Sequence, residues 1–167
     1  EPDARAVEAS ADASGVTGNK YYDEVAKYWG GDATKLSPYY YGWTPEVTID
    51  ANGDAQYTKH YSLGRMSHEL SYVMPDEKTV YMSDDGSNVG LFMFKADTAG
   101  DLSSGTIYAA KWNQTSSENG GEATLDWIKL GHSSNSEIKA ILDPDGNVNT
   151  NDAPVFSDIF ATAEPSN

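Results

Sequence analysis

The segment that decides the fold is TVYMSDDGSNVGLFMFK, residues 79–95. Its two apolar stretches, residues 79–83 and 89–95, contain β-branched and aromatic residues that favour strands, and the Asp84-Asp85-Gly86-Ser87 stretch between them has the composition of a turn. The two strands follow each other with no helical crossover, so we expect them to pair antiparallel. The segment therefore predicts the centre of a β-meander.

The same pattern continues on both sides of this segment. Asn52-Gly53 lies between two period-two stretches and predicts a hairpin. A polar loop is expected over residues 113–121. The further strands are expected at residues 44–49, 55–61, 70–74, 106–112 and 124–130. Together these seven strands predict an all-β fold, mainly an antiparallel meander with short helices.

Helical patterning lies outside the strand region. Asn19 is suited to cap a helix that ends at Gly30-Gly31. Residues 135–142 and 155–161 have the spacing of short helices. Residues 1–18 are small and polar, and we expect a flexible leader or edge segment there. Residues 19–167 are then expected to form a single β-rich domain.

The charge balance limits the partners. The 167 residues include 11 Lys plus Arg and 26 Asp plus Glu, a formal net charge of −15. This excess repels nucleic-acid phosphates and anionic lipids, so neither is an expected partner. It suits a protein that binds divalent cations, and equally one that is only kept soluble by its charge. The chain has no cysteine, which excludes disulfides, thiolate metal sites and a cysteine nucleophile.

Histidine offers few catalytic arrangements in this sequence. None of the three histidines lies in an HExxH spacing or in a local serine-hydrolase motif. His68 is the candidate that we pursue, because it stands beside Glu69 in Gly64-Arg65-Met66-Ser67-His68-Glu69. Here a carboxylate at the start of a strand is a candidate metal ligand. The alternative is a surface salt bridge between Arg65 and Glu69.

Two acidic turns are further candidates for calcium. Asp84 and Asp85 are adjacent carboxylates at a strand end, and they suit either a bound cation or the capping of a tight turn. Asp143 and Asp145 begin a loop, residues 143–152, with oxygen-bearing side chains at alternate positions. The loop lacks the glycine and glutamate positions of an EF-hand, so it is either a calcium loop of another kind or a solvated loop.

Four ordered segments resemble the PhoX-like family of bacterial, calcium-dependent alkaline phosphatases. Residues 64–69 are similar to the family's G-R-F-x-H-E segment, and residues 80–85 to its V-Y-M-x-D-D strand. Residues 90–95 match the strand that ends in an aromatic residue and lysine, and residues 41–47 resemble G-W-x-x-E-V. The resemblance covers about residues 40–112 well and the flanks more loosely.

This resemblance implies a six-bladed β-propeller whose channel holds a mixed iron and calcium centre. It implies Glu69 as a metal ligand, with Asp84 and Asp85 as further metal candidates and with Arg65 and His68 in catalytic support. The implied reaction is metal-assisted hydrolysis of phosphomonoesters. The implied location is extracellular or periplasmic. The chain shows neither signal-peptide features in residues 1–18 nor an apolar run of about 20 residues.

The sequence also departs from the family pattern. The family centre uses a cysteine and other residues that we do not find in this chain. Seven strands amount to about two blades at four strands each, so we expect a propeller fragment whose centre is completed by other segments or by other copies of the chain. The first alternative is a non-catalytic calcium-binding propeller or self-assembling subunit. The second is a carbohydrate-binding β-module that uses the aromatic residues 39–43.

Overall fold

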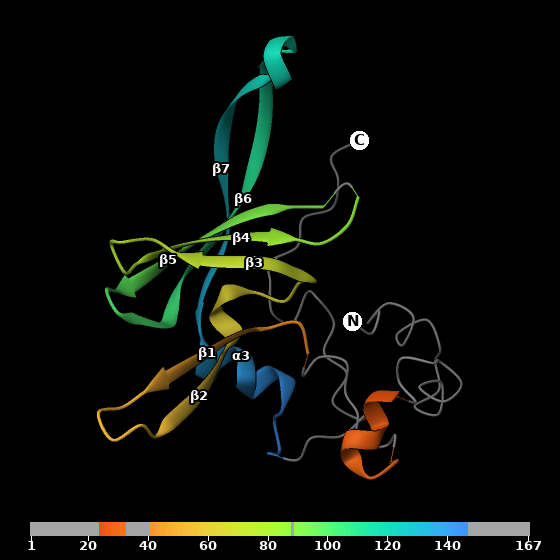
Figure 1. Ribbon diagram of the computed structural model, residues 1–167, viewed down its shortest axis with the longest axis vertical. Coiled ribbons are helices and arrows are strands. Elements are labelled where there is room, and N and C mark those ends of the chain that lie inside the picture. Colours follow the sequence, from red (N-terminus) through yellow and green to blue (C-terminus); the bar gives the residue numbers. More distant parts are fainter. Residues whose placement is uncertain (1–23, 33–40, 88, 147–167) are drawn as a thin grey trace. The chain divides into compact units, whose positions relative to one another are not determined.

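The structure is a computed structural model that describes residues 24–32, 41–87 and 89–146 (Figure 1). The chain divides into two compact units. The larger unit is Trp43–Asn135, and the smaller unit combines Glu1–Gly42 with Ser136–Asn167. The expected leader at residues 1–18 and the expected helix at residues 155–161 lie outside the described residues.

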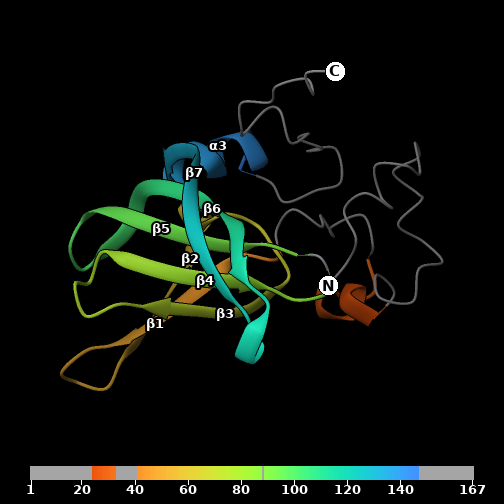
Figure 2. The same ribbon diagram turned by 90° about the horizontal axis from the view of Figure 1, so that it is seen from above.

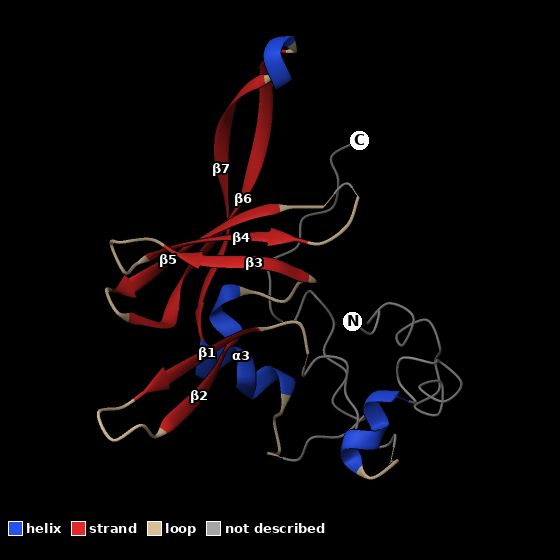
Figure 3. Ribbon diagram, viewed as in Figure 1, coloured by secondary structure: helices blue, strands red, loops and turns tan. Residues whose placement is uncertain are grey.

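The described residues of the larger unit form seven strands, and every pairing between them is antiparallel. Strand content far exceeds helix content (Figure 3), so the all-β prediction is confirmed. The strands are β1 (Thr44–Ile49), β2 (Ala55–His60), β3 (His68–Val73), β4 (Thr79–Asp84), β5 (Leu91–Thr98), β6 (Asp101–Ser116) and β7 (Glu122–Ser134). They form a two-stranded sheet, β1-β2, and a five-stranded sheet in the order β3-β4-β5-β6-β7.

The β1-β2 hairpin turns where the Asn-Gly pair predicts it. Asp50 Oδ1 accepts hydrogen bonds from the backbone N–H groups of Asn52 (2.8 Å) and Asp54 (2.9 Å). These two bonds, that of Asp54 first, lower the pKa of the Asp50 carboxyl. Gly53 has φ +90°, a backbone conformation that favours glycine.

A buried histidine connects this hairpin to the end of β7. His60 is 3% exposed, and its Nε2 lies 2.7 Å from Glu46 Oε2 on the paired strand. Because a carboxylate only accepts, Nε2 carries the proton, and Nδ1 is left to accept from the Asn135 amide at 3.1 Å. Asn135 Oδ1 in turn accepts from the backbone N–H of Ser62 at 2.9 Å. His60 is therefore part of the scaffold.

The five-stranded sheet buries one face through the alternation of side chains along its central strands. Val80, Phe94 and Ile107 face one another across β4, β5 and β6 and are 0%, 0% and 6% exposed. Alternate residues of a strand point to opposite faces, which explains why Tyr81 on the other face is 36% exposed. The strands lie side by side in chain order when seen from above (Figure 2).

A short 3-10 helix, η5 (Tyr61–Leu63), packs against β6 and β7. Leu63 is completely buried, and the Ser62 hydroxyl donates to the carbonyl oxygen of Leu102 at 2.7 Å. The helix leads directly into the segment that carries the candidate site. The core of the larger unit thus fixes the approach to β3.

Strands β6 and β7 are longer than the sequence predicts. The expected polar loop at residues 113–121 is wrong, because β6 continues to Ser116 and only a short turn with η6 (Glu118–Gly120) separates it from β7. The pairing of β5 with β6 ends at Phe92 and Ala109, so beyond this point β6 pairs with β7 alone and the two strands form a projecting arm (Figure 1). Both faces of such an arm meet solvent, so polar residues are compatible with strand structure. The Asn113 amide donates to Asp126 across the arm at 2.8 Å.

Helix η2 (Lys27–Trp29), and all of α3 (Asn135–Leu142) except its first residue, belong to the smaller unit. A helical turn at residues 24–26 continues into η2, which ends at Gly30 in the left-handed conformation (φ 68°), as expected. Helix α3 has the predicted bounds, with Ile138 and Leu142 buried. The start of the first helix lies outside the described residues. None of the described helices has the length and apolar character needed to cross a membrane.

Candidate functional site

Residues 64–69 connect η5 to β3, and Gly64 shows why this segment begins with glycine. Gly64 has φ +87° and ends the 3-10 helix by donating its N–H to the Tyr61 carbonyl at 3.1 Å. A Cβ at this position would lie 2.8 Å from Cδ1 of Ile107 in the core. Both the backbone conformation and the lack of space therefore require glycine. Two residues later, the buried Met66 anchors the segment.

Glu69 occupies a β-bulge at the beginning of β3. His68 pairs with Asp84 and Leu70 pairs with Ser83, so Glu69 is an extra residue with no counterpart on β4. β3 is also an edge strand of the five-stranded sheet, and the Glu69 side chain is exposed. A bulge redirects a side chain and is frequent near active sites. The predicted ligand thus has both an unusual backbone position and access to solvent.

Asp84 and Asp85 lie at the end of β4, against the same segment. The Asp85 N–H donates to the Ser67 carbonyl at 2.6 Å, and the Asp84 N–H donates to Gly90 at 3.2 Å. Asp84 Oδ1 is buried and has no hydrogen-bond partner among the described residues. A buried carboxylate oxygen without a donor is costly, because it has lost its hydration. The backbone therefore brings Arg65, His68, Glu69, Asp84 and Asp85 to the same end of the β3-β4 pair.

The His68 ring lies between two hydroxyl groups. Its Nε2 is 3.5 Å from Thr44 Oγ1, its Nδ1 is 3.4 Å from Ser71 Oγ, and the two hydroxyl oxygens are 3.2 Å apart. Thr44 begins β1, so this cluster connects the two sheets. Sequence reasoning missed Thr44 and Ser71, and no sequence signal marks them, since hydroxyl residues 27 positions apart meet only in the fold. The predicted catalytic roles of His68 and Arg65 stay predictions.

Asp143 and Asp145 belong to the smaller unit. Asp143 is buried, and its Oδ2 accepts from Lys139 Nζ at 3.0 Å, one helical turn earlier in the chain. Its Oδ1 is buried without a hydrogen-bond partner within the described part of the chain. Asp145 is exposed. Much of the loop that was expected to bind calcium, residues 147–152, lies outside the described residues, so both positions stay predictions.

The side chains at the β3-β4 end fit a divalent cation in part. Carboxylate oxygens are the ligands that Ca²⁺ prefers. Asp84 Oδ1 is such an oxygen, and no donor in the described part of the chain forms a hydrogen bond with it. However, no group of three or more His, Cys, Asp or Glu residues is placed to hold a metal ion in the described ranges. For iron, the cysteine ligand that the resemblance implies is absent, because the chain has no cysteine. The described residues therefore offer carboxylate oxygens of the kind that Ca²⁺ prefers, without forming a complete metal-binding group.

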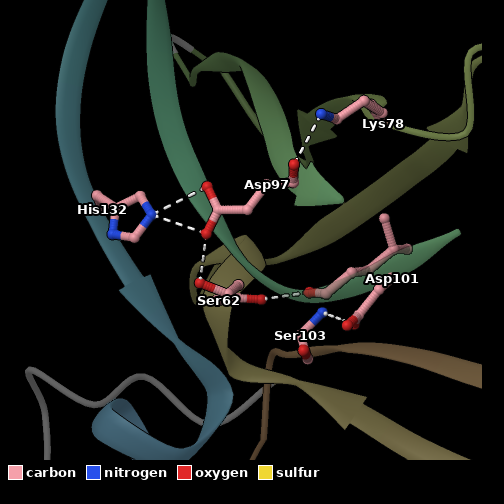
Figure 4. Close-up of polar contacts among 8 residues, drawn as sticks. Ser62, Lys78, Asp97, Asp101, Ser103 and His132 are labelled. Atoms are coloured by element: carbon pink, nitrogen blue, oxygen red, sulfur yellow. Dashed lines mark hydrogen bonds and ion pairs between the residues drawn. The ribbon is translucent and has the colours of Figure 1, made fainter. Parts of the chain in front are cut away.

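A second polar cluster surrounds Asp97 at the end of β5 (Figure 4). Its carboxylate accepts from Ser104 Oγ at 2.7 Å and lies 3.0 Å from His132 Nε2, while its backbone carbonyl accepts from Lys78 Nζ at 2.7 Å. The Ser104 and His132 contacts, in that order, lower the pKa of the Asp97 carboxyl. A hydrolytic triad needs the serine to donate to the histidine, whereas Ser104 donates to the acid. The cluster therefore connects the strands β5, β6 and β7 and does not form a hydrolytic triad.

The aromatic residues 39–43 do not form an exposed platform where they are described. Trp43 is 6% exposed and packs edge-on against Tyr61, with ring centroids 5.0 Å apart. The Tyr41 hydroxyl accepts from Trp29 Nε1 at 3.1 Å. Residues 39 and 40 lie outside the described residues. Trp43 is thus a packing residue and is not available for stacking on a sugar.

Comparison with known proteins gives one match. The model of the family described as alkaline phosphatase PhoX matches residues 6–163. No curated protein and no solved structure gives a significant match to the chain. The matched range includes the candidate residues at the β3-β4 end and extends well beyond the four segments that carry the resemblance. The chain belongs to the PhoX family of alkaline phosphatases.

Proposed function

We propose that this chain forms part of a calcium-dependent phosphomonoesterase and contributes Glu69 to its metal centre. The observation that carries the proposal is the position of Glu69, an exposed carboxylate in the bulge of an edge strand. Asp84 pairs with His68, the residue directly before the bulge, and its buried Oδ1 lacks a donor among the described residues. Family membership supports phosphatase chemistry and metal dependence.

In this proposal the chain's residues have separate tasks. Glu69 and Asp84 supply carboxylate oxygens to the centre, and Asp85 adds negative charge beside them. Arg65, four residues before Glu69, supplies a guanidinium whose planar donors suit a phosphate group. When bound, divalent cations polarise the phosphoryl oxygens and stabilise the in-line displacement. The remaining ligands of the centre come from segments outside this chain.

The proposed architecture is a β-propeller. In a propeller blade the innermost strand, which lines the channel, is an edge strand of its sheet. β3 is an edge strand, and Glu69 is its second residue. This position supports an orientation of Glu69 toward the channel. The observed division into two and five strands differs from two four-stranded blades, so the number of blades stays a proposal. An extracellular or periplasmic location accords with the family, whose members are usually secreted.

The test is hydrolysis of p-nitrophenyl phosphate by the full natural polypeptide that contains these residues, assayed with Ca²⁺ and with a chelator. We expect activity that depends on Ca²⁺ and that falls at least about a hundredfold in Glu69→Gln, because the variant loses a ligand charge. Glu122→Gln is the matched control, since Glu122 is exposed at the start of β7. Activity that is equal in Glu69→Gln and the wild-type protein would contradict the proposal.

The second candidate is a calcium-binding or self-assembling protein without catalysis. It is favoured by one observation, that β3 and β7 are the edge strands of the five-stranded sheet. Exposed edge strands can pair with another chain. This candidate predicts Ca²⁺ binding or self-association without phosphatase activity in the same assay.

A further inference from the structure

The β3 bulge imposes a specific relation between His68 and Ser71. In a regular strand, residues three positions apart point to opposite faces of the sheet. The extra residue Glu69 shifts this alternation, so His68 pairs with Asp84 while Ser71 pairs with Met82, and both face the same side. This is why the hydroxyl of Ser71 can lie 3.4 Å from Nδ1 of His68.

Thr44 completes the contact from the other sheet. Its Oγ1 lies 3.2 Å from Ser71 Oγ and 3.5 Å from His68 Nε2. Thr44 is half-buried, as are His68 and Ser71, so solvent reaches these polar groups only in part. These contacts involve both sides of the bulge, because His68 directly precedes Glu69 and Ser71 follows it by two residues.

We infer that Thr44 and Ser71 are positioning residues, whose hydroxyl groups hold the His68 ring and thereby fix the bulge that presents Glu69. The inference rests on the proposed function, because it names what the fixed bulge is for. A bulge in an edge strand is held by ladder bonds on one side only, so it needs further contacts to keep one geometry. In this role His68 connects Thr44 and Ser71 to Glu69, the next residue in the chain.

The inference gives His68 a positioning role, whereas the resemblance implies that His68 supports catalysis. In this role His68 positions Glu69, and each of its two ring nitrogens lies next to a hydroxyl group. Outer-shell partners of this kind tune metal affinity, and their removal typically weakens it by about 10–100-fold. The same loss is expected here when the hydroxyl contacts are removed.

The experiment compares four variants of the full natural polypeptide. Thr44→Val and Ser71→Ala remove one hydroxyl each, Thr44→Ser keeps it, and Thr48→Val is a matched control at an exposed position of β1. The first readout, without metal, is hydrogen–deuterium exchange of the amides of residues 68–71. The second is the dissociation constant for Ca²⁺ by calorimetry.

We expect Thr44→Val and Ser71→Ala to speed the exchange of residues 68–71 by about fivefold or more, with β4 and β5 unchanged. Ca²⁺ affinity should fall about tenfold in parallel, and Thr44→Ser should restore both values. Unchanged exchange in both variants overturns the inference, as does faster exchange throughout β4 and β5. Unchanged Ca²⁺ affinity despite local loosening overturns it too. A wild-type protein that binds no Ca²⁺ refutes the proposed function instead, while the exchange data still decide whether the hydroxyl groups hold the bulge.

Discussion

The ring of Phe94 lies against Gly105 on the adjacent strand β6. A Cβ at Gly105 would come within 2.5 Å of Phe94 Cζ and within 2.3 Å of the Lys95 carbonyl oxygen. Phe94 is completely buried, so its ring has no free space to move into. The largest buried side chain of the sheet is therefore accommodated by a residue without a side chain.

Gly105→Ala should consequently destabilise the larger unit. We expect the free energy of unfolding to fall by about 1–3 kcal/mol, because the added methyl group meets a backbone oxygen as well as a ring. Denaturant unfolding measures this loss. Thr115→Ala, at an exposed position of the same strand, is the control and should stay within about 0.5 kcal/mol of the wild-type protein. Equal stability of the two variants would show that Gly105 is not tightly packed.

Asp76 should make stability depend on pH in the acid range. Its carboxylate accepts from the Thr79 hydroxyl at 2.6 Å and from the Thr79 N–H at 2.8 Å, and these bonds lower its pKa from 3.8 to about 2. A lowered pKa means that the stabilisation is present above the unfolded value and is lost as pH falls from about 4 toward 2. Asp76→Asn should therefore lower the melting temperature at pH 6 and approach the wild-type value near pH 2. A constant difference between the two proteins across this range would be evidence against the assignment, with Glu122→Gln as the control for loss of charge.

Asp97 and His132 should be energetically coupled across β6. Each is about half exposed, so the expected effect of Asp97→Asn or His132→Gln is small, a loss of about 2 °C or less in melting temperature. The double variant is the informative protein. Its loss in melting temperature should be smaller than the sum of the losses in the two single variants. Strict additivity would mean that the contact contributes nothing.

Calcium should stabilise the protein through Asp84. Its buried Oδ1 lacks a donor among the described residues, and a bound cation would satisfy it. Ligand at a hundred times its dissociation constant adds about 2.7 kcal/mol to the free energy of unfolding, so the melting temperature should rise with Ca²⁺. Asp84→Asn should lose most of this rise, whereas Glu122→Gln should keep it. A calcium response that is identical in all three proteins would exclude Asp84 as a ligand.

The fold was largely accessible from the sequence because strand signals are local. The Thr79–Asp84 strand, the Asp50 turn and helix α3 follow from alternation, turn residues and spacing, and the structure has them within a residue or two of the predicted bounds. The arm of β6 and β7 was missed because Asn113 and its neighbours read as a loop. Their strand structure comes from pairing with β7, which polarity does not reveal.

The site was accessible only in part. Glu69, Asp84 and Asp85 stand out in sequence as acids at strand ends, and the fold places all three at one end of the β3-β4 pair. The bulge itself left no trace in the sequence, because the pairing register of β3 depends on β4. The hydroxyl contacts of Thr44 and Ser71 connect different sheets and are likewise invisible in sequence.

The central claim is that Glu69 is a ligand of a calcium-containing centre. Calorimetric titration of the metal-free natural polypeptide with Ca²⁺ tests it most directly, with Glu69→Gln and Glu122→Gln measured alongside. The account predicts saturable binding by the wild-type protein and by Glu122→Gln, and a dissociation constant at least about tenfold weaker in Glu69→Gln. Binding by Glu69→Gln that equals the wild-type value, or no binding by any of the three proteins, would contradict it.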